Sequence, residues 1–271
     1  MSLRIQSNIE AFNAHRNVAN TSMQLAKAME RLSSGYRINR AGDDTAGLAI
    51  SEKLRAQVGG LQQAQQNAQD AVSLVQTAEG ALGEVHAMLQ RVRDLAVQYN
   101  NGTLSTSDKA SITAEVAQLC AEIAKVGTNT KFNGISLLSG GATITFQVGA
   151  DDGQTLTVAA AKLFGSGSTN LVDSAIFAFT GTSLMASIDT AIGNVSTARG
   201  TFGSVQNRLE HTLNNLSVFE ENLSASESRI RDVDVASEMA TYTKLNVLQQ
   251  AGVAILAQAN SAPQAVLSLL R

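Results

Sequence analysis

The stretch Leu54–Ala96, LRAQVGGLQQAQQNAQDAVSLVQTAEGALGEVHAMLQRVRDLA, decides the fold. Alternating steps of three and four residues along it meet apolar side chains, with Gln57 as the one polar exception. The apolar positions are Leu54, Leu61, Ala64, Ala68, Ala71, Val75, Ala78, Leu82, Val85, Leu89, Val92 and Ala96. A seven-residue repeat sustained over about six heptads predicts a long α-helix that packs along one stripe.

Three further segments repeat this pattern, so the sequence predicts a mainly α fold. One register runs from Ile188 to Val233, and another runs from Leu245 to Leu269. A broader N-terminal stripe consists of Ala11/Phe12, Val18/Ala19, Leu25/Ala26 and Leu32. A shorter helix is predicted over about residues 107–126, where apolar residues share one face.

The composition changes between the two helical halves. Residues 140–181 are rich in Gly, Ser and Thr, which is typical of turns and connections. Thr143–Val148 and Thr155–Val158 each alternate with period two around a Gly-rich turn, which predicts one small β-hairpin at about residues 143–158. Residues 159–183 are predicted to form a short variable surface segment.

The composition disfavours several classes of protein. The 271 residues include 20 Lys+Arg and 23 Asp+Glu, a formal net charge of −3, so no nucleic-acid partner is expected. Runs of 18 apolar residues are absent, so no membrane insertion is expected. The first 30 residues contain no apolar segment of the secretory type. The single proline, Pro263, leaves room for very long helices.

No catalytic site, cofactor or metal is expected. The three histidines, His15, His86 and His211, are far apart and have no ligand at metal-binding spacing. Metalloprotease, nucleophile-elbow and phosphate-loop motifs are also absent. Cys120 follows Leu119 on a predicted helix, so we expect a buried apolar thiol and not a nucleophile.

The outermost helical segments are expected to be incomplete by themselves. Heptad repeats are equally compatible with an intramolecular bundle. However, two helices that pair only with each other bury one stripe apiece, and the N-terminal stripe is too wide for a single partner. We therefore expect both arms to become ordered only where other subunits cover their remaining faces.

Several segments resemble the bacterial flagellin family. The longest is Arg31–Ser51, RLSSGYRINRAGDDTAGLAIS. The others are Gln65–Ala71 (QQNAQDA), Thr77–Leu82 (TAEGAL), Asn222–Asp234 (NLSASESRIRDVD) and Ala257–Asn260 (AQAN). These motifs occur in the family's order, and the resemblance covers about residues 1–158 and 184–271.

This resemblance implies a division of the chain into parts. Residues 1–33 and 234–271 would form a terminal coiled-coil domain, and residues 34–43 a linker. Residues 44–158 and 184–233 would form a helical rod domain without the outer domains of larger flagellins. The residues expected to take part in assembly of the terminal arms are Ile5, Ile9, Phe12, Leu25, Leu32, Leu248, Ile255 and Leu269.

The linker residues Gly35, Gly42, Asp43 and Asp44 are expected to connect arm and rod. Asp43 or Asp44 is expected to cap the next helix, with Gly42 relieving the turn. A plain loop between helices explains the same residues, and a metal-binding acidic pair is not expected.

Arg91 and Leu95 lie one turn apart and off the apolar stripe, so they are expected to form an exposed apolar and cationic patch. The segment Gln90–Val97 resembles the flagellin segment that contacts neighbouring subunits and is recognised by Toll-like receptor 5, and Glu115 matches that epitope. Asp94 replaces the commoner Glu. An ordinary solvated helix face is the alternative interpretation.

The resemblance implies a structural subunit that polymerises into the extracellular flagellar filament for swimming, after unfolded export through the flagellar type III apparatus. Heterologous, non-closing contacts between copies would generate the helix. Further implied partners are an export chaperone, the filament cap protein, the hook–filament junction protein and, in a host, Toll-like receptor 5. The alternatives are the junction protein itself, an adhesive surface filament protein, and an enzyme on a flagellin frame, which the missing catalytic motif disfavours.

Overall fold

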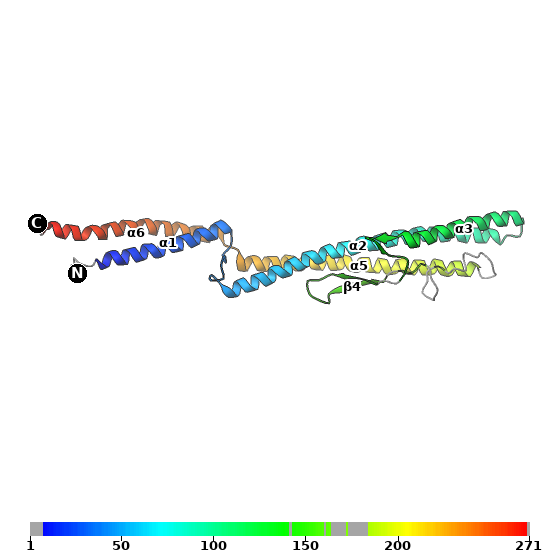
Figure 1. The fold of residues 1–271 in the computed structure, drawn as a ribbon, viewed down its shortest axis with the longest axis horizontal. Helices are drawn as coiled ribbons and strands as arrows, with labels where there is room; N and C mark the ends of the chain where they lie inside the picture. Colours follow the sequence, from blue (N-terminus) through cyan, green and yellow to red (C-terminus); the bar gives the residue numbers. More distant parts are fainter. Residues whose placement is uncertain (1–7, 141–142, 160, 164–171, 173–183, 270–271) are drawn as a thin grey trace. The chain divides into compact units, whose positions relative to one another are not determined.

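The computed structural model describes residues 8–140, 143–159, 161–163, 172 and 184–269, with the backbone alone for residues 184 and 262–269. The described helices are α1 (Ile9–Ser34), α2 (Thr45–Tyr99), α3 (Thr106–Asn129), α5 (Leu184–Arg231) and α6 (Val235–Leu269). The strands are β1 (Lys131–Phe132), β2 (Ile135–Ser136), β3 (Thr143–Gln147) and β4 (Thr155–Ala159) (Figure 1). The predicted mainly α fold is thus confirmed.

The chain folds into two compact units. The terminal unit comprises Met1–Ala56 and Asn222–Arg271, and the central unit comprises Gln57–Glu221. The division falls inside α2 and inside α5. The four-part division given in the sequence analysis stays a prediction, because its boundaries follow family segments and not contacts.

The central unit contains the apolar core, and the predicted α2 stripe lies in it. Val75, Leu82, Leu89 and Val92 are all completely buried. The α5 residues of this cluster are Ile188, Ala191, Val195, Phe202 and Leu209. The α3 residues are Ile112, Val116, Cys120 and Ile123. Three helices therefore share one core, in which side chains at heptad spacing exclude water.

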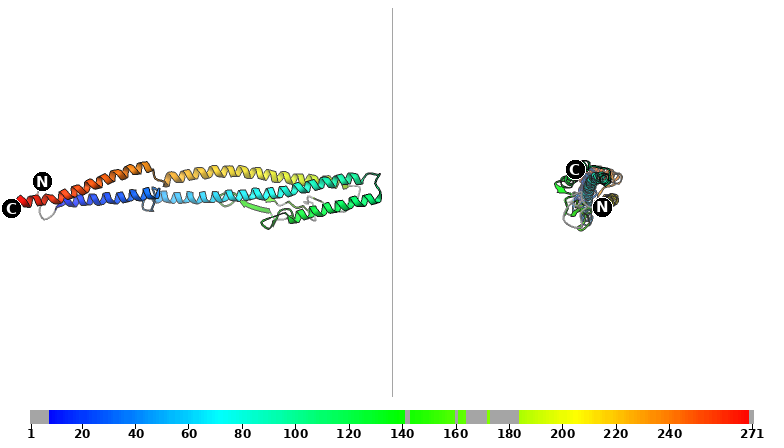
Figure 2. Two further views of the ribbon diagram at one scale, coloured as in Figure 1. Left: turned by 90° about the horizontal axis from the view of Figure 1, so that it is seen from above. Right: turned by 90° about the vertical axis from the view of Figure 1, so that its right-hand side faces the viewer.

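Helix α2 has a second buried row beside this stripe. Leu74 and Leu95 are buried, and Ala81 and Met88 at the same seven-residue spacing pack against the core. Helix α3 runs back beside α2 (Figures 1 and 2), so α2 has neighbours on two sides. The prediction of an exposed Leu95 is therefore wrong: only 2% of this residue is exposed, because a single-partner stripe underestimates how much of α2 is covered.

Two hairpins extend the central unit. Strands β3 and β4 pair antiparallel with Thr143 opposite Ala159 and Gln147 opposite Thr155, as the alternating sequence predicts. Strands β1 and β2 form a second hairpin, which the sequence analysis missed. Its turn is Asn133-Gly134, with φ of 48° and 81°. An Asn-Gly pair is the usual sequence signal for such a two-residue turn, because both positions need positive φ.

We predict that Leu95→Ala destabilises the central unit by about 2–5 kcal/mol, since it leaves a cavity in a well-packed core. Urea denaturation followed by circular dichroism measures this loss in free energy of unfolding. The control is Val97→Ala on the same helix, where the side chain is 52% exposed and a change within about 0.5 kcal/mol is expected. Equal effects of the two substitutions would contradict the burial of Leu95.

Candidate assembly site

Helices α1 and α6 lie side by side and antiparallel within the terminal unit (Figures 1 and 2). Their contact is close at one point, where a Cβ added to Gly252 would come within 2.8 Å of Val18 Cγ2. Glycine therefore permits the helices to approach there. Among the described residues of the pair, Ala28 and Leu245 are the only buried apolar side chains. The pair thus has a narrow seam and little core of its own.

One end of this seam has a specific polar contact. The Asn8 Oδ1 accepts the Ala11 N–H at 3.0 Å and so caps α1, while Asn8 Nδ2 donates to the Ala259 carbonyl of α6 at 2.7 Å. Helix α6 continues through Pro263, which has no backbone N–H to donate to that same carbonyl four residues earlier. The asparagine therefore supplies the hydrogen bond that the proline removes.

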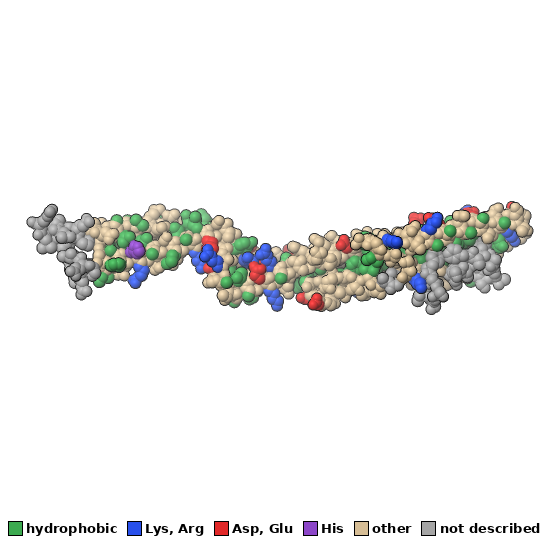
Figure 3. All heavy atoms as spheres, in the orientation of Figure 1, with side chains coloured by type: hydrophobic (Ala, Val, Ile, Leu, Met, Phe, Trp, Pro, Cys, Tyr) green, Lys and Arg blue, Asp and Glu red, His purple; other side chains and the backbone are tan. Residues whose placement is uncertain are grey.

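Large apolar side chains remain uncovered on both helices. Phe12 is 73% exposed and Ile255 is 61% exposed in the single chain, and both are among the residues expected to take part in arm assembly. Ile9 and Leu248 are also exposed, and Leu25 and Leu32 are partly buried. Figure 3 shows apolar side chains along the surface of this pair. Ile5 and the side chain of Leu269 lie outside the described residues.

The two chain segments that leave these helices are joined by a short backbone bridge. The Arg37 N–H donates to the Arg231 carbonyl at 2.7 Å, and the Val233 N–H donates to the Gly35 carbonyl at 3.0 Å. Gly35 ends α1 with φ of 76°, a left-handed conformation that favours glycine. The bridge therefore fixes the linker against the break between α5 and α6 by hydrogen bonds that need no particular side chain.

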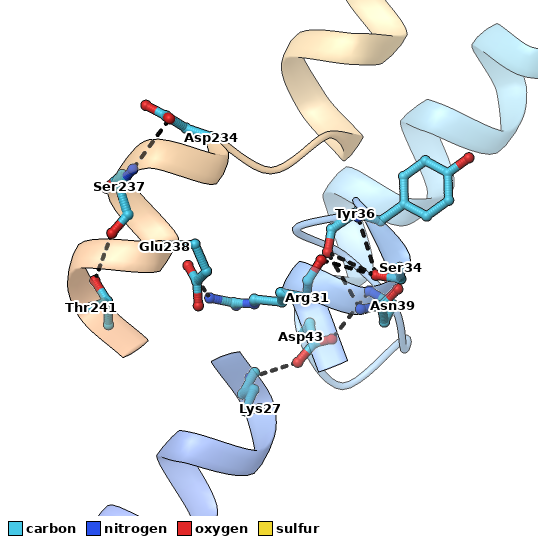
Figure 4. A network of polar contacts seen from close by, with 10 residues as sticks. All are labelled: Lys27, Arg31, Ser34, Tyr36, Asn39, Asp43, Asp234, Ser237, Glu238 and Thr241. Atoms are coloured by element: carbon cyan, nitrogen blue, oxygen red, sulfur yellow. Dashed lines mark hydrogen bonds and ion pairs between the residues drawn. The ribbon is translucent and has the colours of Figure 1, made fainter. Parts of the chain in front are cut away.

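The two aspartates of the linker, Asp43 and Asp44, have different roles; Figure 4 shows Asp43. Asp44 accepts the Gly47 N–H at 2.8 Å at the start of α2, and so provides the predicted helix cap. The Asp43 carboxylate instead binds the Lys27 ammonium at 2.6 Å and the backbone N–H of Arg40 at 3.1 Å. The hydrogen bond from Lys27 lowers the pKa of Asp43 to about 2, which keeps this carboxylate charged.

The role predicted for Gly42 is wrong. Its φ is outside the left-handed region, and an added Cβ would meet nothing within 4 Å. The constrained glycine is Gly47, where a Cβ would collide with the capping carboxylate of Asp44 and lie 2.9 Å from Ile38. The turn therefore depends on close packing at the first turn of α2 and not on backbone freedom at residue 42.

Side chains around the linker add contacts that sequence reasoning missed. The Arg231 guanidinium binds Glu52 at 2.7 Å and lies 4.8 Å from the centre of the Tyr36 ring. Arg31 faces Glu238 across the pair at 3.8 Å (Figure 4). These contacts join residues far apart in the chain, so no local spacing could indicate them. Only Arg31, Tyr36 and Arg231 lie within the two signature segments, and their acidic partners Glu52 and Glu238 lie just outside them.

The predicted patch on α2 is in part a contact within the chain. Arg91 Nε and Nη2 donate to Glu115 Oε1 of α3 at 3.0 and 2.7 Å, and both side chains stay about half exposed. Gln90 is exposed and lies 3.0 Å from His86 Nε2. With Leu95 buried, the surface that remains is polar, consisting of Gln90, Arg91 and Glu115.

Neither a metal-binding cluster nor a membrane-spanning helix is found in the described part of the chain. It contains no group of three or more His, Cys, Asp or Glu residues able to hold a metal ion. None of its helices is long and apolar enough to cross a membrane. Cys120 is buried, as predicted, and desolvation raises the pKa of its thiol to about 11.

Paired terminal helices with uncovered apolar faces are typical of a structural subunit that assembles with its own kind. Comparison with known proteins gives its family. Residues 5–143 match the bacterial flagellin N-terminal helical region, and residues 185–270 match the flagellin C-terminal helical region. The chain belongs to the bacterial flagellin family, and it is a structural subunit of the extracellular flagellar filament.

Relatives of similar length support this assignment. The chain is 52% identical over 270 residues to flagellin of Halalkalibacterium halodurans, with 98% of this chain and 99% of that protein covered. It is 46% identical over 306 residues to flagellin of Bacillus subtilis, with 99% and 100% covered. A solved Vibrio parahaemolyticus structure, described as a flagellar hook-associated protein, matches with a TM-score of 0.58 and 18% identity over 70% of this chain and 100% of that one. That likeness concerns the fold alone.

We predict that Asn8→Ser weakens the α1–α6 seam, because serine still caps α1 but is too short to reach the Ala259 carbonyl. The expected loss is about 1 kcal/mol per subunit, measured as a lower temperature of heat dissociation of assembled protein.

Pro263→Ala provides the matched control, since alanine returns a backbone N–H to that carbonyl. In the Pro263→Ala background, Asn8→Ser should have less than half of its effect. An undiminished effect would refute the link between the asparagine and the proline.

Proposed function

We propose that α1 and α6 carry the contacts by which copies of this chain polymerise into the helical filament. The observation behind this proposal is the exposure of Phe12, Leu248 and Ile255 on two helices that cover each other along one seam. Water-exposed apolar side chains of this size favour burial against further copies. Burial of this kind would make the arms more ordered in the polymer than in a solitary chain.

Replacing an uncovered apolar side chain by a charged one tests this proposal. Ile255→Glu and Phe12→Glu should abolish polymers in seeded assembly followed by sedimentation and negative-stain microscopy, since the filament would have to bury an unpaired charge. Circular dichroism of the monomer should be unchanged, because both positions are exposed in the single chain.

The matched control is Gln250→Glu, which adds the same charge at an exposed polar position of α6 and should still polymerise. Removal of residues 245–271 should abolish filaments altogether. Normal filaments from the truncated chain, or from Ile255→Glu, would refute the role of the arms.

We further propose that the surface of Gln90, Arg91 and Glu115 is the part of the central unit that neighbouring subunits and Toll-like receptor 5 contact. Its support is the resemblance of this segment to the family's contact segment, together with the half exposure of the Arg91–Glu115 pair. An exposed ion pair contributes about 0–1 kcal/mol to folding, so these side chains remain available to a partner. Leu95 takes no direct part, because it is buried.

Arg91→Ala should therefore lower receptor signalling at least about tenfold, as expected when a central arginine of an interface is lost. Reporter cells that express the receptor measure this change, and thermal unfolding should shift little. Arg208→Ala, at another exposed cation of the central unit, is the control and should signal normally. Full signalling by Arg91→Ala would show that the receptor does not depend on this surface and would refute the proposal.

The same uncovered faces support a proposal about the proteins that bind the chain before and during assembly. An exported chain that carries apolar arms needs a chaperone to cover the C-terminal arm, a cap protein at the growing end and a junction protein at the filament base. The single proline and the single cysteine favour export in an unfolded state, because few slow isomerisation or redox steps then limit refolding.

A further inference from the structure

The charged side chains of the α1–α6 pair are almost completely matched. Within the described parts of the two helices the carboxylates are Glu10, Glu30 and Glu238, and the cations are Arg16, Lys27, Arg31 and Lys244. Glu30 binds Arg40, Glu238 faces Arg31, Lys27 binds Asp43, and Arg16 bonds to the Asn13 amide. Among these seven charged side chains of the described parts of α1 and α6, Glu10 and Lys244 alone have no hydrogen-bond or ion-pair partner. One carboxylate and one ammonium are thus left over.

These two charges cannot meet within one chain. The close approach of Gly252 to Val18 and the pairing of Glu238 with Arg31 fix the antiparallel register of the helices. In that register Lys244 lies at the level of about residue 25 of α1, some 15 residues from Glu10. At 1.5 Å per residue, the separation along the axis is about 20 Å, far beyond an ion pair.

Lys244 lines a groove between α1 and α6 that suits a carboxylate. The groove has a volume of about 360 Å³, and its charged residues are Lys27, Arg31, Lys244 and Glu238. Lys27 is neutralised by Asp43, so Arg31 and Lys244 face one carboxylate, Glu238, and an excess of one positive charge remains. Arg31 Nε is buried and has no hydrogen-bond acceptor, and the 3.8 Å pair with Glu238 is long. A further carboxylate at the groove would therefore compete for the Arg31 guanidinium, whose pair with Glu238 is long.

Many of the uncovered apolar side chains lie in two groups, which are separated along the pair by a distance similar to that between Glu10 and Lys244. One group lies near Glu10 and consists of Ile9, Phe12, Val253 and Ile255. The second group lies near the groove and consists of Met23, Met29, Met239, Val247 and Leu248. In the antiparallel register the groups are about 12 residues apart, or about 20 Å. A displacement that places Glu10 of one copy at the groove of a second copy also brings the first apolar group of one copy close to the second apolar group of its neighbour.

We propose that Glu10 of one copy docks into the groove at Lys244 and Arg31 of a second copy of this chain, displaced by about 20 Å along the α1–α6 axis. This inference rests on the proposed assembly of the arms and names one contact within it. The contact is heterologous, because a carboxylate on one copy meets cations on another, so repetition extends a polymer and does not close a dimer. The ion pair selects the displacement, and the apolar groups around it supply burial.

A charge exchange in the full-length chain tests the proposal. The readout is the critical concentration for seeded polymerisation, measured by sedimentation. Lys244→Glu should raise it at least about tenfold, since two carboxylates then face each other, and Glu10→Lys should do the same. The double variant, Glu10→Lys with Lys244→Glu, should return to within about threefold of the wild-type value, because it restores an opposite pair.

A mismatched double variant, Glu10→Lys with Arg16→Glu, provides the control. It has the same net charge but leaves Lys244 in place, so it should not be rescued. Circular dichroism and thermal unfolding of each monomer exclude a folding defect as the cause of lost assembly.

The outcomes separate this contact from the role of the arms as a whole. Rescue by the matched exchange alone supports the contact. If the matched double variant assembles no better than the poorer single variant, or if Lys244→Glu assembles normally, the contact is refuted while arm-driven assembly stands. If the wild-type chain itself forms no polymer, the proposed assembly by the arms fails as well.

Discussion

The structure depends on one constraint: a long helix with apolar side chains on more than one face must be covered on each of them. Within the central unit the chain meets this requirement by itself. There α2 packs its heptad stripe into a core shared with α3 and α5, and its second row, from Leu74 to Leu95, is covered too. In the terminal unit α1 and α6 cover each other along one seam, and Phe12 and Ile255 remain in water. We propose that further copies in the flagellar filament cover these side chains.

The linker meets a different requirement, which is to hold the breaks between helices in place without a core. Backbone hydrogen bonds at Gly35 and Arg37 bridge to residues 231–233, and the Lys27–Asp43 pair fixes the turn. Most of these groups remain partly exposed, so each contributes little by itself. Together, these contacts and the backbone bridge fix the conformation of the linker. This arrangement also explains the dense signature at residues 31–51, because several contacts depend on specific side chains there.

The site could be predicted in part, and the errors have physical causes. The Asp44 cap follows from local chemistry, since an aspartate just before an apolar helical run satisfies free N–H groups. Leu95 was misplaced because one stripe was assigned to α2, although Leu74, Ala81, Met88 and Leu95 also recur every seven residues. The β1–β2 hairpin was missed despite its Asn-Gly turn, since two-residue strands have no periodicity to detect.

The sequence by itself determined the helical class, the heptad registers, the β3–β4 hairpin and the family, because periodicity and signature motifs are local properties of the chain. Only the tertiary structure decided which apolar residues are covered, and which charges find partners across α1 and α6. Those outcomes depend on pairs such as Asn8 with Ala259 and Arg31 with Glu238, whose members are more than 200 residues apart. No local pattern encodes such pairs, since they form only once the antiparallel register of the two helices is set.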